Sequence, residues 1–323
     1  MTWIAWRQQR MQVLLSIALI AVVTGVLVYF RFDAVTYMAD HGISGCVDID
    51  EGRCSASAMD AFAGRYKSYV AVLPLVLLCL PVLLGMFAGA PLFAREFEQG
   101  THIFALTQSV GRIRWCSTKL LIAAVPVLAG TALLGLVATW SLRPLSFVAH
   151  GRMTTPGFET QGIVVTAYTL LAIAVGATAG LLWRNTVAAM ALTIACYLLL
   201  LIGVAAAARP NYTDPVERRG TVAGGNAIGS QSGRSLVPDD AWRVGSAYYN
   251  AAGTAVDFDP SSCKSTDGTI ETCLSRQQIA TVSASFHPDG QFWRLQLTES
   301  LIFLVAATAL LSLGAWALLK RLL

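Results

Sequence analysis

The side chains that most often carry chemistry are few in this sequence and far apart. Four histidines, His41, His102, His150 and His287, show no metal-ligand spacing and no neighbouring serine or cysteine to activate. No G-x-x-x-x-G-K-[ST] phosphate-binding loop occurs, and no acidic residue lies in the middle of a long apolar run. We therefore expect no active site, metal or cofactor in this chain and no ion-coupled carrier.

The segment with the most informative polar residues is 94–119, A-R-E-F-E-Q-G-T-H-I-F-A-L-T-Q-S-V-G-R-I-R-W-C-S-T-K. It predicts the end of a helix, a turn at Gly100, a short helix capped by Thr101, and a second break at Gly111. An ordinary charged loop with a tryptophan anchor explains these residues equally well. The side chains that could engage a partner are Arg95, Glu96, Glu98, Gly100, Thr101 and Arg112.

Composition decides which elements position this segment. Of 323 residues, 55% are hydrophobic and 13% charged, against about 25% charged in an ordinary soluble domain. The apolar residues form long runs instead of alternating with polar ones, and the mean hydropathy is +0.59. Each run is near or beyond the ~18 residues that a membrane-spanning helix needs. The six runs are 12–30, 69–93, 118–140, 163–183, 186–208 and 298–319.

These runs predict an all-α integral membrane protein with six transmembrane helices. Backbone amides in lipid must pair within the segment, and the runs lack the alternation of barrel strands. Small residues in the fourth run, such as Gly176, Ala177, Ala179 and Gly180, indicate close helix packing. The net charge of +4 arises from loops, so we expect no nucleic-acid partner.

Charge counting predicts the orientation, because lysine and arginine favour cytoplasmic loops. With the N-terminus inside, the cytoplasmic segments hold nine cations and two acids, while the exterior holds fourteen cations and seventeen acids. We therefore expect both termini to be cytoplasmic.

The cysteines support this orientation, because disulfides persist on the oxidising side. Cys46 and Cys54 fall in the first exterior loop, and Cys263 and Cys273 fall in the last. Four cysteines allow three connectivities, and we favour the two local pairs because each closes a short loop. Free thiols and cross-loop bridges are the alternatives.

The domain organisation follows from the loop lengths. Residues 1–208 hold helices one to five with the cytoplasmic segment 94–119, residues 209–297 form an extracellular insertion, and residues 298–323 form the last helix and a cytoplasmic tail. Within the insertion, Ile279, Val282 and Phe286 recur at helical spacing and predict a helix over 275–286.

The N-terminal residues predict an interfacial segment followed by an uncleaved span. Trp3 and Trp6 lie one helical turn apart beside two arginines, and with Trp115 they are the predicted interfacial anchors. The run that follows is longer than the apolar region of a signal peptide and lacks a small-x-small cleavage site.

Segment 96–119 resembles the E-x-E-x-G-T … R-x-x-W/K stretch of ATP-binding-cassette (ABC) transporter permeases of the type-2 exporter family. The matching residues are Glu96, Glu98, Gly100, Thr101, Gln108, Arg112, Trp115 and Lys119. The start W-x-x-W-R-Q at 3–8 and the passage H-P-x-x-x-F-W-x-x-Q-x-x-E at 287–299 resemble one bacterial branch of that family. Gly111 departs from the pattern, since that position often holds a different small or polar residue.

This resemblance implies a multi-pass permease subunit of a bacterial cytoplasmic membrane. Segment 96–116 would be the coupling helix seated in a separate ATPase, which would bind ATP and magnesium. Six spans are half of the usual twelve, so the chain would pair with a second permease, either a copy or a sister chain.

Two other classes of function stay open. A membrane-anchored sensor or assembly factor would use 209–297 for binding without transport. A membrane enzyme would combine His287 with Asp289, or use Asp239 and Asp240, although paired aspartates in a turn-rich segment are usually solvated turn formers.

Overall fold

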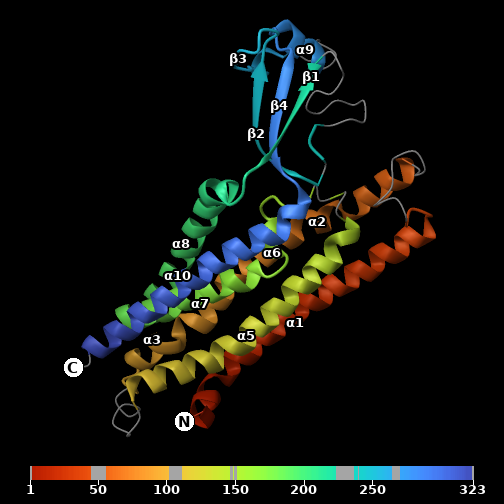
Figure 1. Cartoon of the computed structure of the whole chain (residues 1–323). Helices are drawn as coiled ribbons and strands as arrows, with labels where there is room; N and C mark the ends of the chain where they lie inside the picture. The colour runs from red at the N-terminus through yellow and green to blue at the C-terminus, as the bar shows by residue number, and fades with distance from the viewer. Residues whose placement is uncertain are drawn as a thin grey trace.

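A computed structural model describes residues 2–44, 56–101, 111–145, 148, 151–222, 236–238, 240–263 and 270–321. Long helices form an elongated bundle, a small sheet stands at one end, and both chain termini lie at the opposite end (Figure 1). We call these the sheet end and the terminal end. Because the termini share one end, the chain crosses the bundle an even number of times.

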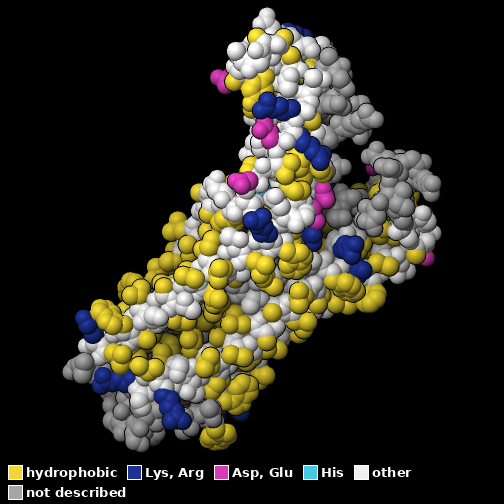
Figure 2. Space-filling model, viewed as in Figure 1, with side chains coloured by type: hydrophobic (Ala, Val, Ile, Leu, Met, Phe, Trp, Pro, Cys, Tyr) yellow, Lys and Arg dark blue, Asp and Glu magenta, His cyan; other side chains and the backbone are white. Residues whose placement is uncertain are grey.

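Six helices in the described residues are long and apolar enough to cross a membrane, which confirms the predicted number of spans. They are α1 (Thr2–Asp40), α2 (Ala56–Leu84), α5 (Arg112–Leu142), α7 (Val164–Trp183), α8 (Thr186–Gly203) and α10 (Phe292–Arg321). Hydrophobic side chains cover the visible surface of the helical bundle between the two ends (Figure 2). Such a surface suits lipid, since a soluble protein rarely exposes so large an apolar area.

Short helical pieces extend several of these spans. They are the π-helical turn η2 (Gly85–Gly89), α3 (Pro91–Glu98), the 3₁₀ turn η3 (Arg143–Leu145), α6 (Gly157–Thr160), the π turn η4 (Val204–Ala208) and the 3₁₀ turn η5 (Arg209–Asn211). Through η2 and α3 the second span continues to Glu98, beyond the predicted end at residue 93.

The first span is longer than its apolar run because residues at the end of that run and beyond it contact α2. Phe30 stacks on Tyr69 with ring centroids 3.9 Å apart, and the Tyr66 hydroxyl donates to Asp33 at 2.5 Å. Hydropathy identifies only the part of a helix that is apolar enough for lipid. These contacts stabilise the helix beyond that part, so that α1 ends at Asp40.

Helix α7 lies at the centre of the bundle and is buried along nearly its whole length. A Cβ added to Gly176 would lie 2.7 Å from the Ala90 nitrogen, and one added to Gly180 would lie 2.7 Å from the Ala90 carbonyl oxygen. These glycines therefore let the backbone of α7 touch the junction of η2 and α3 directly. The predicted close packing of the fourth run is confirmed.

The segment before the last span forms a sheet, so the prediction of an all-α fold is wrong here. Its strands are β1 (Val216–Thr221), β2 (Trp242–Tyr249), β3 (Ala255–Val256) and β4 (Thr281–His287), in the antiparallel order β1-β4-β2-β3. Two short helical pieces accompany them, the 3₁₀ turn η7 (Pro260–Ser262) and α9 (Ile270–Arg276). A last 3₁₀ turn, η9 (Asp289–Gln291), leads from β4 into α10.

The predicted helix over 275–286 is likewise wrong, because α9 ends at Arg276 and β4 begins at Thr281. Val282, Ala284 and Phe286 alternate along β4 and are buried in the core of the sheet domain. Three apolar residues match helical spacing by chance, and the partner strands β1 and β2, which lie far away in sequence, favour the extended form.

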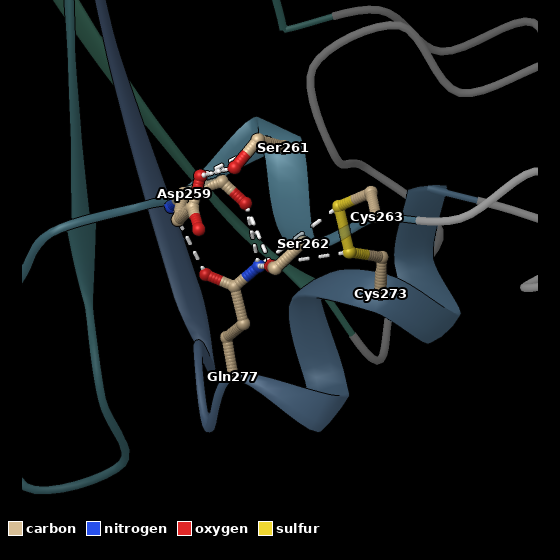
Figure 3. Close-up of a disulfide and its surroundings, with 6 residues drawn as sticks. All are labelled: Asp259, Ser261, Ser262, Cys263, Cys273 and Gln277. Atoms are coloured by element: carbon tan, nitrogen blue, oxygen red, sulfur yellow. Dashed lines mark hydrogen bonds between the residues drawn. A yellow bond between two sulfur atoms is a disulfide. The ribbon is translucent and has the colours of Figure 1, made fainter.

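One of the two predicted disulfides is present. Cys263 and Cys273 are joined, which fixes the chain between η7 and α9. Gln277 lies beside the bond, where its amide donates to the Asp259 carbonyl at 3.0 Å and to the Ser262 hydroxyl at 2.6 Å (Figure 3). Hydrogen bonds from Ser261 hold the pKa of Asp259 below its ordinary value. Cys46 and Cys54 lie outside the described residues.

Candidate functional site

The predicted coupling segment begins on α3, whose inner face is packed against the bundle. Phe93 and Trp115 contact each other with ring centroids 5.5 Å apart, in a buried cluster between α3, α5 and α7. The carboxylate of Glu96 forms an ion pair with Lys119 of α5, which is only 5% exposed. Two spans are therefore joined by apolar packing and by a shielded ion pair.

Glu98 ties α3 to a third span. Its carboxylate oxygens accept hydrogen bonds from the backbone N–H and the hydroxyl of Thr186, each at 2.8 Å. These donors lie at the start of α8, where a carboxylate accepts hydrogen bonds from unpaired backbone amides. The positive end of the helix dipole stabilises its negative charge. Asn185 caps the same helix by accepting from the Ala188 N–H at 2.9 Å. The sequence analysis missed this role, because nothing local connects Glu98 to a residue 88 positions away.

Arg184 adds a further contact between these loops. It ends α7 in the left-handed conformation with φ of 55°, and its guanidinium lies 5.0 Å from the centroid of the Phe97 ring. The loop between α7 and α8 therefore rests directly on the end of α3.

Gly100 turns the chain after α3 with φ of +69°, a conformation that side chains rarely adopt. No atom lies within 4 Å of a Cβ added there. A larger residue at this position would therefore be disfavoured by backbone strain and not by a steric clash. Thr101 follows the turn, and the predicted short helix falls in residues 102–110, outside the described part of the chain. Arg112 is the first residue of α5.

The three predicted tryptophan anchors have two different environments. Trp3 and Trp6 are exposed on α1, and Arg7 lies 5.4 Å from the Trp3 ring. Trp115, expected to face the lipid headgroups, is instead 4% exposed and lies beneath α3. Its position next to two arginines resembled an anchor in the sequence, whereas the tertiary fold places its indole in the core.

A second polar cluster lies at the sheet end and was not predicted. Arg209, 1% exposed, binds Glu159 at 2.8 Å and Glu299 at 2.9 Å. Tyr168 of α7 donates to Glu299 at 2.9 Å, and Thr155 donates to Glu159 at 2.6 Å. We call Glu159, Arg209 and Glu299 the buried triad. It joins α6, η5 and α10, whose residues are distant in sequence.

The passage at 287–299 lines this junction. Gln296 is fully buried, accepts from the Val164 N–H at 2.9 Å and donates to the Phe158 carbonyl at 2.9 Å. The His287 ring nitrogens lie 2.8 Å from Gln291 and 3.2 Å from the Pro210 carbonyl. The spacing of Gln296 and Glu299 on one helical face was a signal for this packing.

The enzyme alternative finds no support in this geometry. Asp289 makes two hydrogen bonds of 2.6 Å with Arg152, while His287 is buried against Gln291 and Pro210. The two side chains are not brought together as an acid and a base. Asp239 lies outside the described residues. No group of three or more potential metal ligands occurs in the part of the chain that the structure describes.

A family model described as ABC-2 membrane transporter related matches residues 17–209. The matched range covers more than half of the chain and includes the coupling segment. No curated protein and no solved structure matches the chain.

Proposed function

The chain belongs to the ABC-2 membrane transporter related family, and from this membership we propose that it is the membrane-spanning permease subunit of an ABC exporter. A separate ATPase would dock on segment 96–116 and supply ATP hydrolysis with magnesium. A second permease, identical or related, would complete the pathway. We place the complex in the bacterial cytoplasmic membrane with the terminal end in the cytoplasm. The nine cations and two acids counted for the predicted cytoplasmic segments favour this orientation. On the face shown in Figure 2, Lys and Arg side chains lie at both ends of the molecule, whereas the visible Asp and Glu side chains lie toward the sheet end.

The single observation that carries the proposal is the triple attachment of α3. Its packing reaches α7 through Gly176 and Gly180, α5 through Glu96 and α8 through Glu98. A displacement of the chain just beyond α3 would therefore be passed to three spans at once. A short rigid element with such contacts is suited to transmit closure of an ATPase to the bundle.

The experiment compares ATP hydrolysis with export by the reconstituted complex. Glu98→Lys places a cation at the start of α8, and Gly100→Val imposes a strained turn. We expect both variants to bind the ATPase but to hydrolyse ATP without matching export. Gly111→Ala is the matched control, because its φ of −59° and open surroundings accept a methyl group.

Wild-type coupling in both variants, with the ATPase bound, would contradict the coupling role. If no ATPase copurifies with the chain from its native membrane, the sensor or assembly-factor alternative gains support instead. In that case the sheet domain becomes the region to test for binding.

A further inference from the structure

A cavity of about 600 Å³ lies at the terminal end of the bundle between α1, η2, α3 and α8. Its volume falls within the range of roughly 300–1,000 Å³ that is typical of small-molecule pockets. Glu98 and Thr186, whose hydrogen bonds are described above, form part of its wall.

The walls change in character along the bundle axis. Toward the middle of the spans they are apolar, with Leu19 from α1, Leu83 and Phe87 from the second span and Met190 from α8. Toward the terminal end they are polar, with Gln12, Arg95, Glu98, Gln99 and Thr186. Gln12 and Leu19 are seven residues apart on one helix, so this change occurs over about 10 Å.

The polar part of the cavity is lined by one cation, Arg95, and one carboxylate, Glu98, which lies close enough to interact with it electrostatically. The carboxylate of Glu98 is engaged by Thr186, whereas the Arg95 guanidinium has no hydrogen-bond or ion-pair partner among the described residues. Gln9, three residues before Gln12 on the same side of α1, is 5% exposed, and its amide has no partner in the described part of the chain. Gln9 does not itself line the cavity, so Arg95 is the lining side chain on which recognition of an anion would depend.

We propose that this cavity binds an anionic amphiphile, with its hydrocarbon chain among the leucines and its headgroup at Arg95. A charged headgroup at the membrane boundary and an acyl chain toward the membrane interior match the two halves of the cavity in order and in polarity. The guanidinium fork is suited to a phosphate or carboxylate headgroup. The site belongs to this chain alone, so it does not depend on docking of an ATPase.

The test uses the purified full-length chain in phosphatidylcholine nanodiscs. Two probes carry a photoreactive diazirine in the acyl chain: a phosphatidic acid built into the nanodisc and a fatty acid added from solution. A diazirine phosphatidylcholine is the zwitterionic comparison. We expect the anionic probes to label peptides containing Leu19, Phe87 or Met190, and the better-labelling probe identifies the bilayer or the aqueous phase as the source.

Arg95→Gln should lower labelling by the anionic probes at least about tenfold, the loss expected for a charge-assisted hydrogen bond. Arg10→Gln is the matched control. Arg10 is an exposed cation near the start of α1, at the terminal end of the bundle, but it does not line the cavity. Leu19→Trp fills the apolar part and should lower labelling by both anionic probes. The melting temperature of each variant checks that the bundle is folded.

Equal labelling of Arg95→Gln and Arg10→Gln, or equal labelling by the zwitterionic probe, would overturn the proposal. Absence of labelling by every probe would overturn it as well. In that case, cross-linking of two chains through Leu19→Cys would show that a second copy covers the cavity. Because no ATPase is present, failure here leaves the proposed transport function untouched.

Discussion

The two ends of the bundle are held together by different kinds of polar contact. At the sheet end, the buried triad and Gln296 lie almost entirely out of solvent. At the terminal end, the Glu96–Lys119 ion pair between α3 and α5 is also shielded, but Glu98 and the start of α8 are joined by solvent-exposed hydrogen bonds. Removing one partner of a buried ion pair costs about 3–5 kcal/mol, whereas exposed polar contacts contribute little and exchange readily with water.

This difference indicates which end can move. The buried triad fixes both connections of the sheet domain, since Arg209 precedes β1 and Glu299 follows β4. The contacts of Glu98 can open without leaving a buried charge behind. A conformational change driven from the terminal end would therefore separate α3 from α8 before it disturbed the sheet end. Three experiments test this difference between the two ends.

The largest effect is expected from Arg209→Met, which leaves two carboxylates without their common cation. We expect a loss of about 3–5 kcal/mol in the free energy of unfolding, measured as a lower melting temperature of the detergent-solubilised chain. Arg219→Met removes an exposed ion pair with Glu217 and serves as the control, with little expected change.

A triple variant tests the cause of that loss. Combining Arg209→Met with Glu159→Gln and Glu299→Gln removes the uncompensated charges, so it should recover much of the lost stability. If Arg209→Met melts at the wild-type temperature, the triad does not fix the sheet end.

An intermediate effect is expected from Cys263→Ser combined with Cys273→Ser. Opening a loop between cysteines ten positions apart should cost the sheet domain about 2.5–3 kcal/mol. Limited proteolysis of proteoliposomes should then cut the sheet domain and leave the six spans intact. Cys79→Ser, which changes a free cysteine, is the control. Simultaneous loss of the spans would show that the sheet domain and bundle are one cooperative unit.

The smallest effect on stability is expected from Thr186→Val, which removes one of the two exposed hydrogen bonds to Glu98. The melting temperature should change least of the three, while the ratio of export to ATP hydrolysis should fall. Glu98→Gln, which removes the carboxylate charge from the same contact, should lower this ratio too. A Glu98→Gln, Thr186→Val double variant should be no worse than the poorer single variant, because both act through one contact. Additive losses in coupling would mean that Glu98 acts through another partner.

Much of the fold could be predicted because membrane spans are determined locally. Six apolar runs gave six helices, the family resemblance is confirmed, and the bond between Cys263 and Cys273 is present. The boundaries were less accurate, as α1 and α2 show, because aromatic and ionic contacts extend the helices past their apolar parts.

For the candidate coupling segment, the sequence predicted the helix end and the turn but not the contacts of its residues. Glu96, Glu98 and Gly100 do lie at the end of the second span, and a glycine was expected at the turn. The partners Lys119 and Thr186, the burial of Trp115 and the cavity beside Arg95 were not predicted. Each depends on residues from another helix, and one sequence contains no signal for such pairs.

Hydrophobicity over about twenty residues decides whether a segment enters lipid, so the amino-acid sequence already specifies where the chain leaves water. The contacts of the charged residues at the helix ends depend instead on the tertiary structure. Glu299 stands near the start of the last apolar run of the sequence, and in the fold it is buried beside Arg209. Likewise β4 matched a helix until its neighbours β1 and β2 supplied the backbone hydrogen bonds of a sheet. In both cases the stabilising free energy comes from contacts with residues that are distant along the chain. Only the folded structure brings these residues together.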